Sequence, residues 1–119
     1  MKKDNVLQSK SFSFAVRVVK AYQYLVKTKS EYVLSKQFLR SGTSIGANVE
    51  EAIGAQSIAD FLAKLAIAYK ESRETNYWIR LLLETGYFSE NESKSLLDEV
   101  LELQKIIAKI RITTKENNS

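Results

Sequence analysis

The fold is decided by the stretch Leu39-Arg40-Ser41-Gly42-Thr43-Ser44-Ile45-Gly46-Ala47-Asn48-Val49-Glu50-Glu51-Ala52. Its apolar spacing predicts a helix, yet its middle consists of small residues. Glycine inside a helix costs about 0.5–1 kcal/mol relative to alanine, so the bare surface calls for a compensating contact. We expect that contact to be the close approach of another helix backbone. The expected partner is the stretch 60–83, whose own small residues are Ala63, Ala66, Ala68 and Ser72.

Length and composition bound the class of protein. The chain has 119 residues, enough to bury a core, and we expect residues 1–119 to form one domain. It has no proline and only four glycines, a composition typical of all-helical proteins. No run of residues approaches the ~20 apolar positions needed to span a bilayer, and no signal peptide is visible. We therefore expect a cytoplasmic protein without a membrane partner.

The apolar periodicity predicts an all-α protein, an antiparallel up-down-up-down four-helix bundle. Short polar turns separate the periodic segments, as expected for helices that pack against their neighbours in sequence. The residues before the first segment are polar and look like a loose lead-in. The helices are expected at about 12–29, 32–54, 58–85 and 90–113.

Capping signals support these boundaries. Ser11 and Ser30 are candidate N-caps of the first and second helices. Gly54 and Gly86 are candidate helix-ending glycines. The two later helices begin with capping-box patterns, Ser57 followed by Asp60 and Ser89 followed by Glu92.

The first helix is apolar over more of its surface than a single neighbour requires. One stripe contains Phe12 and Val19, and a second contains Phe14 and Val18. Either two neighbours of the same bundle cover both stripes, or another subunit contributes to covering them. In the second helix, Asn48 lies beside the core stripe, where a polar side chain often fixes register by hydrogen bonding within the core.

Two motifs resemble the signature of a bacterial four-helix-bundle family. The first motif covers 38–52, and the second combines 60–64 with 70–78. The family is named after open reading frames in intervening sequences of 23S ribosomal RNA genes, and the resemblance spans about 12–112. The motif residues are Arg40, Ser41, Gly42, Ile45, Gly46, Asn48, Glu51, Lys70, Glu71, Arg73, Glu74, Tyr77 and Trp78.

The resemblance implies an antiparallel four-helix bundle, often assembled as a ring-like pentamer, and no established activity. The accessory proteins of diversity-generating retroelements look like relatives, and those act as partners of a reverse transcriptase and of nucleic acid. The resemblance thus implies a homo-oligomer that has RNA, DNA or a nucleic-acid enzyme as a further partner.

The residue types argue against an enzyme. The chain has no histidine and no cysteine, so the usual zinc sites and histidine-dependent nucleophiles are absent. A di-iron bundle would need Glu-x-x-His pairs, which cannot form here. We predict no catalytic residue, no cofactor and no metal. The acidic motif residues are expected to form salt bridges with the basic ones, Glu51, Glu71 and Glu74 with Arg40, Lys70 or Arg73.

Positive charge is concentrated at the start of the chain. Residues 1–30 hold seven basic residues and one acidic residue, whereas acidic residues outnumber basic ones in 31–119. This asymmetry is compatible with nucleic acid as a partner, and equally with a solvated helix face. No known reading motif is present, so we expect contacts with phosphates and little sequence preference. The nucleic-acid-binding candidates are Lys2, Lys3, Lys10, Arg17, Lys20, Lys27 and Lys29.

Two functions remain open at this point. The first is a non-enzymatic oligomeric adaptor or accessory factor associated with nucleic acid. The alternative is a purely structural or protein-binding bundle without nucleic acid. A mobility shift of an RNA or DNA probe that salt abolishes would separate them.

Overall fold

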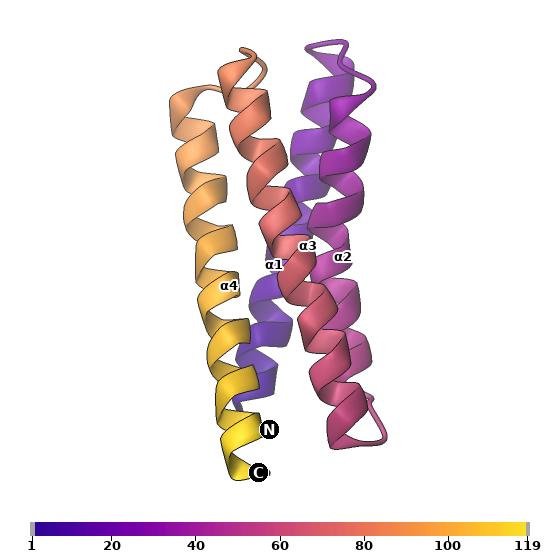
Figure 1. Ribbon diagram of the computed structural model, residues 1–119. Coiled ribbons are helices and arrows are strands. Elements are labelled where there is room, and N and C mark those ends of the chain that lie inside the picture. Colours follow the sequence, from indigo (N-terminus) through magenta and orange to yellow (C-terminus); the bar gives the residue numbers. More distant parts are fainter. Residues whose placement is uncertain (1, 119) are drawn as a thin grey trace.

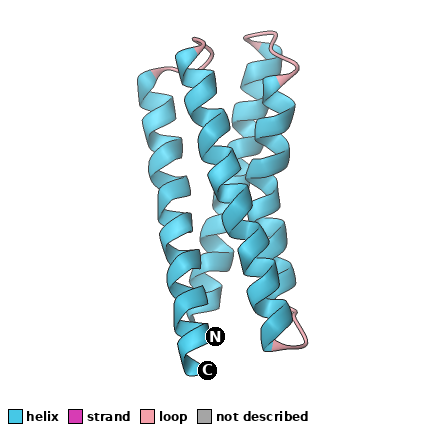
Figure 2. Cartoon of the chain, viewed as in Figure 1, coloured by secondary structure: helices cyan, strands magenta, loops and turns pink. Residues whose placement is uncertain are grey.

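The computed structural model describes the backbone of residues 2–118 and the side chains of residues 6–118. Its four helices alternate in direction, so both ends of the chain lie at the same end of the molecule, and this end is called the terminal end below (Figure 1). The predicted all-α up-down-up-down bundle is confirmed. Loops are confined to three short connections (Figure 2). The helices are α1 (Lys2–Lys27), α2 (Leu34–Ile53), α3 (Ile58–Glu84) and α4 (Glu90–Asn117).

The four helices pack around one elongated core, within overall dimensions of 48 × 21 × 20 Å. Contacts are densest between α2 and α3 and sparsest between α1 and α4, the first and last helices. None of the described helices is apolar over a length sufficient to span a membrane. The expected core stripes of α3 and α4 are buried, including Leu65, Ile79, Val100 and Ile107.

The first helix begins about ten residues earlier than expected. Residues 2–10 continue α1 instead of forming a loose lead-in. Leu7 is 2% exposed and Ser11 is 1% exposed, so both belong to the core stripe that continues through Phe14 and Val18. The assignment of Ser11 as an N-cap was therefore wrong. A serine at a core position interrupted the apolar pattern and hid the first turns of the helix.

The second helix is capped by a glutamate, and the expectation for Ser30 was wrong. Ser30 occupies the left-handed region, with φ of 53°, within the turn. The carboxylate of Glu31 accepts hydrogen bonds from the backbone N–H groups of Val33, Leu34 and Ser35, at 3.2, 3.0 and 2.6 Å. It thereby satisfies donors that have no partner inside the helix.

The later caps agree with the sequence patterns. The Ser57 hydroxyl accepts a hydrogen bond from the backbone N–H of Asp60, at 3.0 Å. Ser89 and Glu92 form a complete capping box. Gly86 follows α3 with φ of +86°, a conformation that side chains disfavour, and so ends the helix.

The glycines of α2 face α1, and the expected close approach to α3 through these glycines was wrong. A Cβ atom on Gly42 would lie 2.7 Å from the Cγ atoms of Val18. A Cβ atom on Gly46 would lie 3.3 Å from the carbonyl oxygen of Ser11. The small residues of α2 therefore serve two neighbours, because Ser41 on the adjacent flank faces α3 instead.

Buried hydroxyl groups join α2 to α3. The Thr75 hydroxyl donates to Ser41 Oγ at 2.9 Å, and both residues are 0% exposed. Asn48 does not play the expected role in core register. Its amide donates to the carbonyl of Ser44 at 2.8 Å, one turn earlier in the same helix.

Candidate nucleic-acid interface

Two of the seven basic candidates are paired within the bundle. Lys10 forms an ion pair with Glu102 at 3.4 Å, and Arg17 forms one with Glu99. Arg17 also donates a hydrogen bond to Ser95 Oγ at 3.0 Å. These contacts join α1 to α4, so both side chains help to hold the two helices together.

Three other candidates remain available to solvent. Lys20, Lys27 and Lys29 are exposed, and none forms an ion pair with an acidic residue among 6–118. Lys20 and Lys27 lie seven residues apart on α1, so they share a flank of that helix. Lys29 follows in the turn at the end opposite the termini. The side chains of Lys2 and Lys3 lie outside the described residues.

The two tyrosines of α1 near these lysines are packing residues, as expected from their helical spacing. Tyr22 and Tyr24 are both half-buried, and Tyr24 packs against the core. The three lysines can therefore supply phosphate contacts. The exposed aromatic side chain nearest to them in sequence is Tyr32, which is 55% exposed in the same connection as Lys29.

The family motifs meet in a polar cluster between α2 and α3. Arg40 pairs with Glu71 at 3.3 Å and with Glu74. Glu74 also accepts a hydrogen bond from the indole N–H of Trp78 at 2.9 Å. The two motifs, far apart in the sequence, thus form one network on the bundle surface, called the Arg40 cluster below.

Electrostatics keep the Arg40 cluster ionised. The Trp78 hydrogen bond and the Arg40 guanidinium together hold the pKa of Glu74 below its ordinary value. The hydrogen bond to Glu74 in turn raises the pKa of Arg40. Glu74 therefore stays charged at neutral pH and keeps its ion pair with Arg40, which links α3 to α2.

Other motif residues take separate positions. Glu51 pairs with Lys64 of α3 at 3.2 Å, so the expected pairing of Glu51 with Arg40, Lys70 or Arg73 was wrong. Lys70 and Arg73 are exposed. Tyr77 is 49% exposed, and its ring packs edge-on against Trp78 and lies under the Arg80 guanidinium. No group of three or more possible metal-binding side chains occurs among the described residues.

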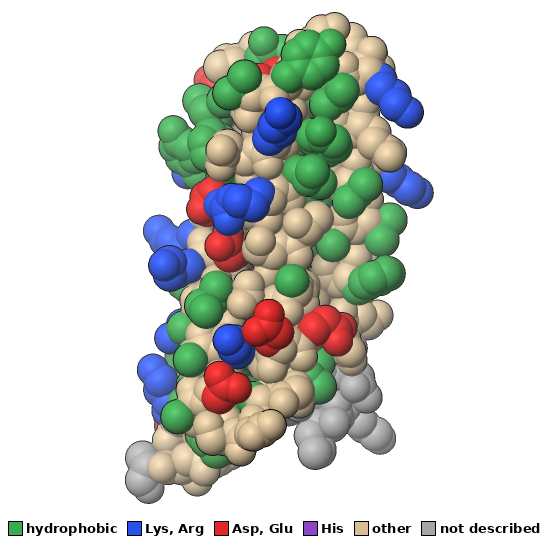
Figure 3. Space-filling view, turned by 90° about the vertical axis from the view of Figure 1, so that its right-hand side faces the viewer, with side chains coloured by type: hydrophobic (Ala, Val, Ile, Leu, Met, Phe, Trp, Pro, Cys, Tyr) green, Lys and Arg blue, Asp and Glu red, His purple; other side chains and the backbone are tan. Residues whose placement is uncertain are grey.

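Exposed apolar residues mark the outer face of α1. Phe12 is 67% exposed, and Val16 and Val19 are each 38% exposed. Their spacing of four and three residues places them on one stripe, called the α1 stripe below. Figure 3 shows hydrophobic side chains scattered down the face formed by α1 and α2. The apolar spacing predicted Phe12 and Val19 on one stripe but did not indicate Val16.

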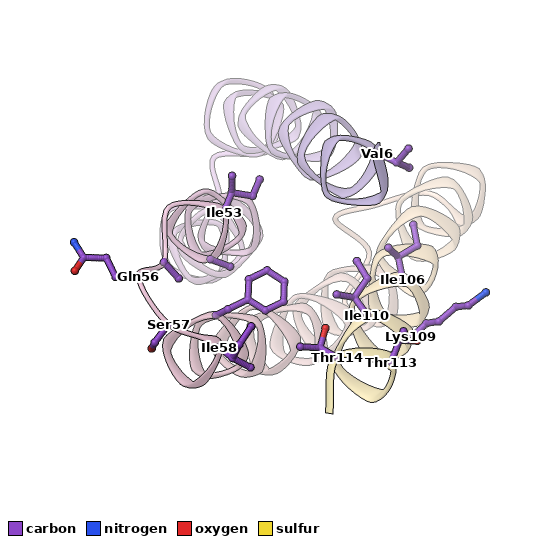
Figure 4. A pocket seen from close by; sticks show the side chains of 13 residues that line it. Val6, Ile53, Gln56, Ser57, Ile58, Ile106, Lys109, Ile110, Thr113 and Thr114 are labelled. Carbon is purple, nitrogen blue, oxygen red and sulfur yellow. The ribbon is translucent and has the colours of Figure 1, made fainter. Parts of the chain in front are cut away.

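A cavity at the terminal end of the bundle was not predicted. It has a volume of about 930 Å³ and is called the end cavity below. All four helices line it, through residues such as Val6, Ile53, Phe61 and Ile110 (Figure 4). The periodic pattern could not reveal it, because these positions look like ordinary core residues near helix ends.

Comparison with known proteins explains the two motifs. The sequence profile described as "23S rRNA-intervening sequence protein" matches residues 3–109. The chain belongs to this family. The expectation from the motif resemblance is thereby confirmed at the level of the family, while its proposed relation to retroelement accessory proteins stays a prediction.

A solved structure shares the fold. It is a crystal structure of a protein of unknown function from the S23 ribosomal protein family of Bacteroides thetaiotaomicron VPI-5482. The two sequences are 50% identical over 92% of this chain and 97% of that chain, with a TM-score of 0.91. No curated protein matches the chain.

Proposed function

We propose that the chain is a non-enzymatic helical bundle that assembles with copies of itself and holds nucleic acid as an adaptor or accessory factor. One observation carries the proposal: the exposed α1 stripe shares a helix with lysines that lack ion pairs in the described part of the chain. Contiguous exposed apolar surface on a soluble protein generally marks an interface. The proposed nucleic-acid-binding residues are Lys20, Lys27 and Lys29. The proposed location of the protein is the cytoplasm.

Assembly would strengthen weak phosphate contacts. A single bundle offers three lysines, and each phosphate contact with a surface lysine is weak on its own. A ring repeats the set in every subunit, which raises the effective concentration of contacts along one nucleic-acid strand. The number of subunits we propose, five, follows the family resemblance and not a feature of this chain.

The second candidate function is a protein-binding bundle without nucleic acid. It is favoured by the ion pairs of Lys10 and Arg17, which remove two positive charges from the basic surface. Under this alternative, the remaining lysines only form a solvent-exposed polar face of the helix and bind no partner.

Fluorescence anisotropy separates the two functions. A labelled single-stranded RNA and a labelled duplex DNA are titrated with protein at low and moderate salt. We expect affinity to fall steeply with salt and to fall in the triple variant Lys20→Gln, Lys27→Gln, Lys29→Gln, because counterion release drives binding. The matched control, Lys70→Gln, Lys105→Gln, Lys115→Gln, removes the same charge elsewhere and keeps its affinity. No binding of either probe at low salt favours the protein-binding alternative.

A further inference from the structure

The end cavity combines an apolar interior with a single cationic position. Ile53 of α2, Ile58 and Phe61 of α3 and Ile110 of α4 supply apolar walls. Figure 4 shows Ile110 and Thr114 on the inner side of α4 and Lys109 extending from its outer edge. Lys109 is the only charged residue among the described residues that line the cavity.

Lys109 follows the ion pairs that join α1 to α4, toward the terminal end of the bundle. Along this seam, Arg17 pairs with Glu99 and Lys10 pairs with Glu102. Lys109 lies seven residues beyond Glu102, on the same flank of α4 and two turns closer to the terminal end. No acidic residue among 6–118 forms an ion pair with Lys109. The two ion pairs between α1 and α4 are thus followed, toward the terminal end, by Lys109, which is unpaired among residues 6–118 and lines the cavity.

A hydroxyl group accompanies this lysine. Thr113 lines the cavity and lies one turn after Lys109, so the two side chains are neighbours on the helix surface. An ammonium donor beside a hydroxyl donor suits a carboxylate, which has only acceptor oxygens. The apolar walls at the other side suit an aliphatic chain. Ligand cavities of this kind are mostly apolar, with a few polar groups that fix orientation, and measure roughly 300–1,000 Å³.

We propose that the end cavity binds a medium-chain aliphatic carboxylate, with its chain between Ile53, Phe61 and Ile110 and its carboxylate beside Lys109 and Thr113. The site is independent of the nucleic-acid function proposed above. It lies at the terminal end, whereas Lys27 and Lys29 lie at the opposite end of α1.

The test uses decanoate as the probe, decanol as its uncharged match, and the full chain. Isoleucine methyl groups are observed by NMR during titration below the micelle concentration. We expect saturable shifts at Ile53, Ile58 and Ile110 and none at Ile79, which is buried near the opposite end of α3. Absence of saturable shifts with decanoate, or shifts confined to other residues, overturns the proposal.

Two variants test the assignment of head and chain. Lys109→Gln should weaken decanoate binding about three- to fivefold, as for a solvent-exposed ion pair, and leave decanol binding unchanged. The matched control Lys105→Gln, an exposed lysine one turn earlier and outside the end cavity, should bind both probes like the unaltered chain. Equal decanoate affinity in Lys109→Gln and the unaltered chain overturns the head-group assignment.

The chain-binding region is tested by filling it. Ile110→Trp adds volume on the inner side of α4 and should abolish binding of both probes. Circular dichroism checks that the variant keeps its helical content. If it does not fold, Ile58→Asn, at a position 47% exposed, provides a second variant that should weaken both probes. The proposed site is overturned if Ile110→Trp and Ile58→Asn both fold and both bind the probes with the affinity of the unaltered chain.

Discussion

Gly46 of α2 lies so close to Ser11 of α1 that a Cβ atom on Gly46 would be 3.3 Å from the Ser11 carbonyl oxygen. The neighbour is backbone, which cannot rotate away as a side chain could. Ser11 is small and 1% exposed, so both residues at this crossing are small enough to let the two helices approach closely. The helical cost of a glycine is therefore offset by the close packing of two backbones.

Gly46→Leu should destabilise the bundle by about 1–3 kcal/mol, because a larger side chain must push α1 away from α2. Chemical denaturation monitored by circular dichroism measures the effect. Ala47→Leu is the matched control, since the adjacent residue is exposed and leucine is a good helix former. An unchanged midpoint for Gly46→Leu would contradict the crossing described here.

Glu31 makes stability depend on pH. Burial disfavours its charged form, but backbone hydrogen bonds from Leu34, Ser35 and Val33 outweigh burial and lower the pKa of Glu31. A carboxylate with a lowered folded-state pKa stabilises the fold above its unfolded value, about 4.3. This contribution is lost as pH falls through the folded-state pKa. We therefore expect unfolding free energy to decline as the solution is acidified below that range.

Glu31→Gln tests the cap directly. An amide retains the shape but offers one acceptor oxygen where the carboxylate has two, so we expect a loss of about 1–2 kcal/mol at neutral pH. The variant should also lose part of the decline in stability on acidification. Glu84→Gln removes a similar charge from an exposed position and should change stability by a few tenths of a kcal/mol at most. Equal behaviour of the two variants would contradict the capping role.

The Arg40 cluster predicts a spectroscopic titration. Trp78 is the single tryptophan of the chain, and its indole N–H donates to Glu74. Protonation of Glu74 should change Trp78 emission, with a midpoint below the ordinary glutamate value because the pKa of Glu74 is lowered. In Arg40→Gln the midpoint should move upward, since one of the groups that stabilise the carboxylate is removed.

Arg73→Gln is the control for this titration. Arg73 is exposed in the same motif and makes no ion pair with Glu74, so the midpoint should stay where it is in the unaltered chain. The measurement is confined to pH values at which helical content is constant. The network is contradicted if Arg40→Gln and Arg73→Gln give the same midpoint.

Assembly should depend on the α1 stripe. Val16→Lys places a charge at the centre of the stripe, between Phe12 and Val19, and should lower the mass of the assembled protein toward that of a monomer. Light scattering coupled to size exclusion measures this mass. Leu101→Lys is the control, because Leu101 of α4 is similarly exposed, at 42%, but lies outside the stripe. A monomeric mass for the unaltered chain at micromolar concentration would contradict assembly altogether.

Sequence periodicity was enough to predict the bundle and most of its core. Regular apolar spacing in α3 and α4 identified Leu65, Ile79, Val100 and Ile107, because each helix buries a stripe of constant period. The start of α1 was missed where Ser11 replaces an apolar residue. Small residues predicted a close helix approach but not its partner, since Gly42 and Ser41 are neighbours in sequence and face different helices.

The candidate sites were less predictable, because they depend on the third dimension. A count of charges indicated a basic first helix, but only the structure shows that Lys10 and Arg17 are paired with α4. The Arg40–Glu71–Glu74 pairing followed from the expectation of salt bridges between motifs. The end cavity arises from the divergence of helix ends, which no local pattern encodes.

The sparse seam between α1 and α4 has a consequence for motion and folding. It joins the two helices most distant in sequence, so its closure carries the largest loop entropy and should come last on the folding pathway. The pairs Lys10–Glu102 and Arg17–Glu99 are partly exposed, so added salt weakens them. Amide protons along the facing sides of α1 and α4 should therefore exchange through a local opening, and concentrated salt should accelerate this exchange. Amide protons between α2 and α3 should exchange only through global unfolding.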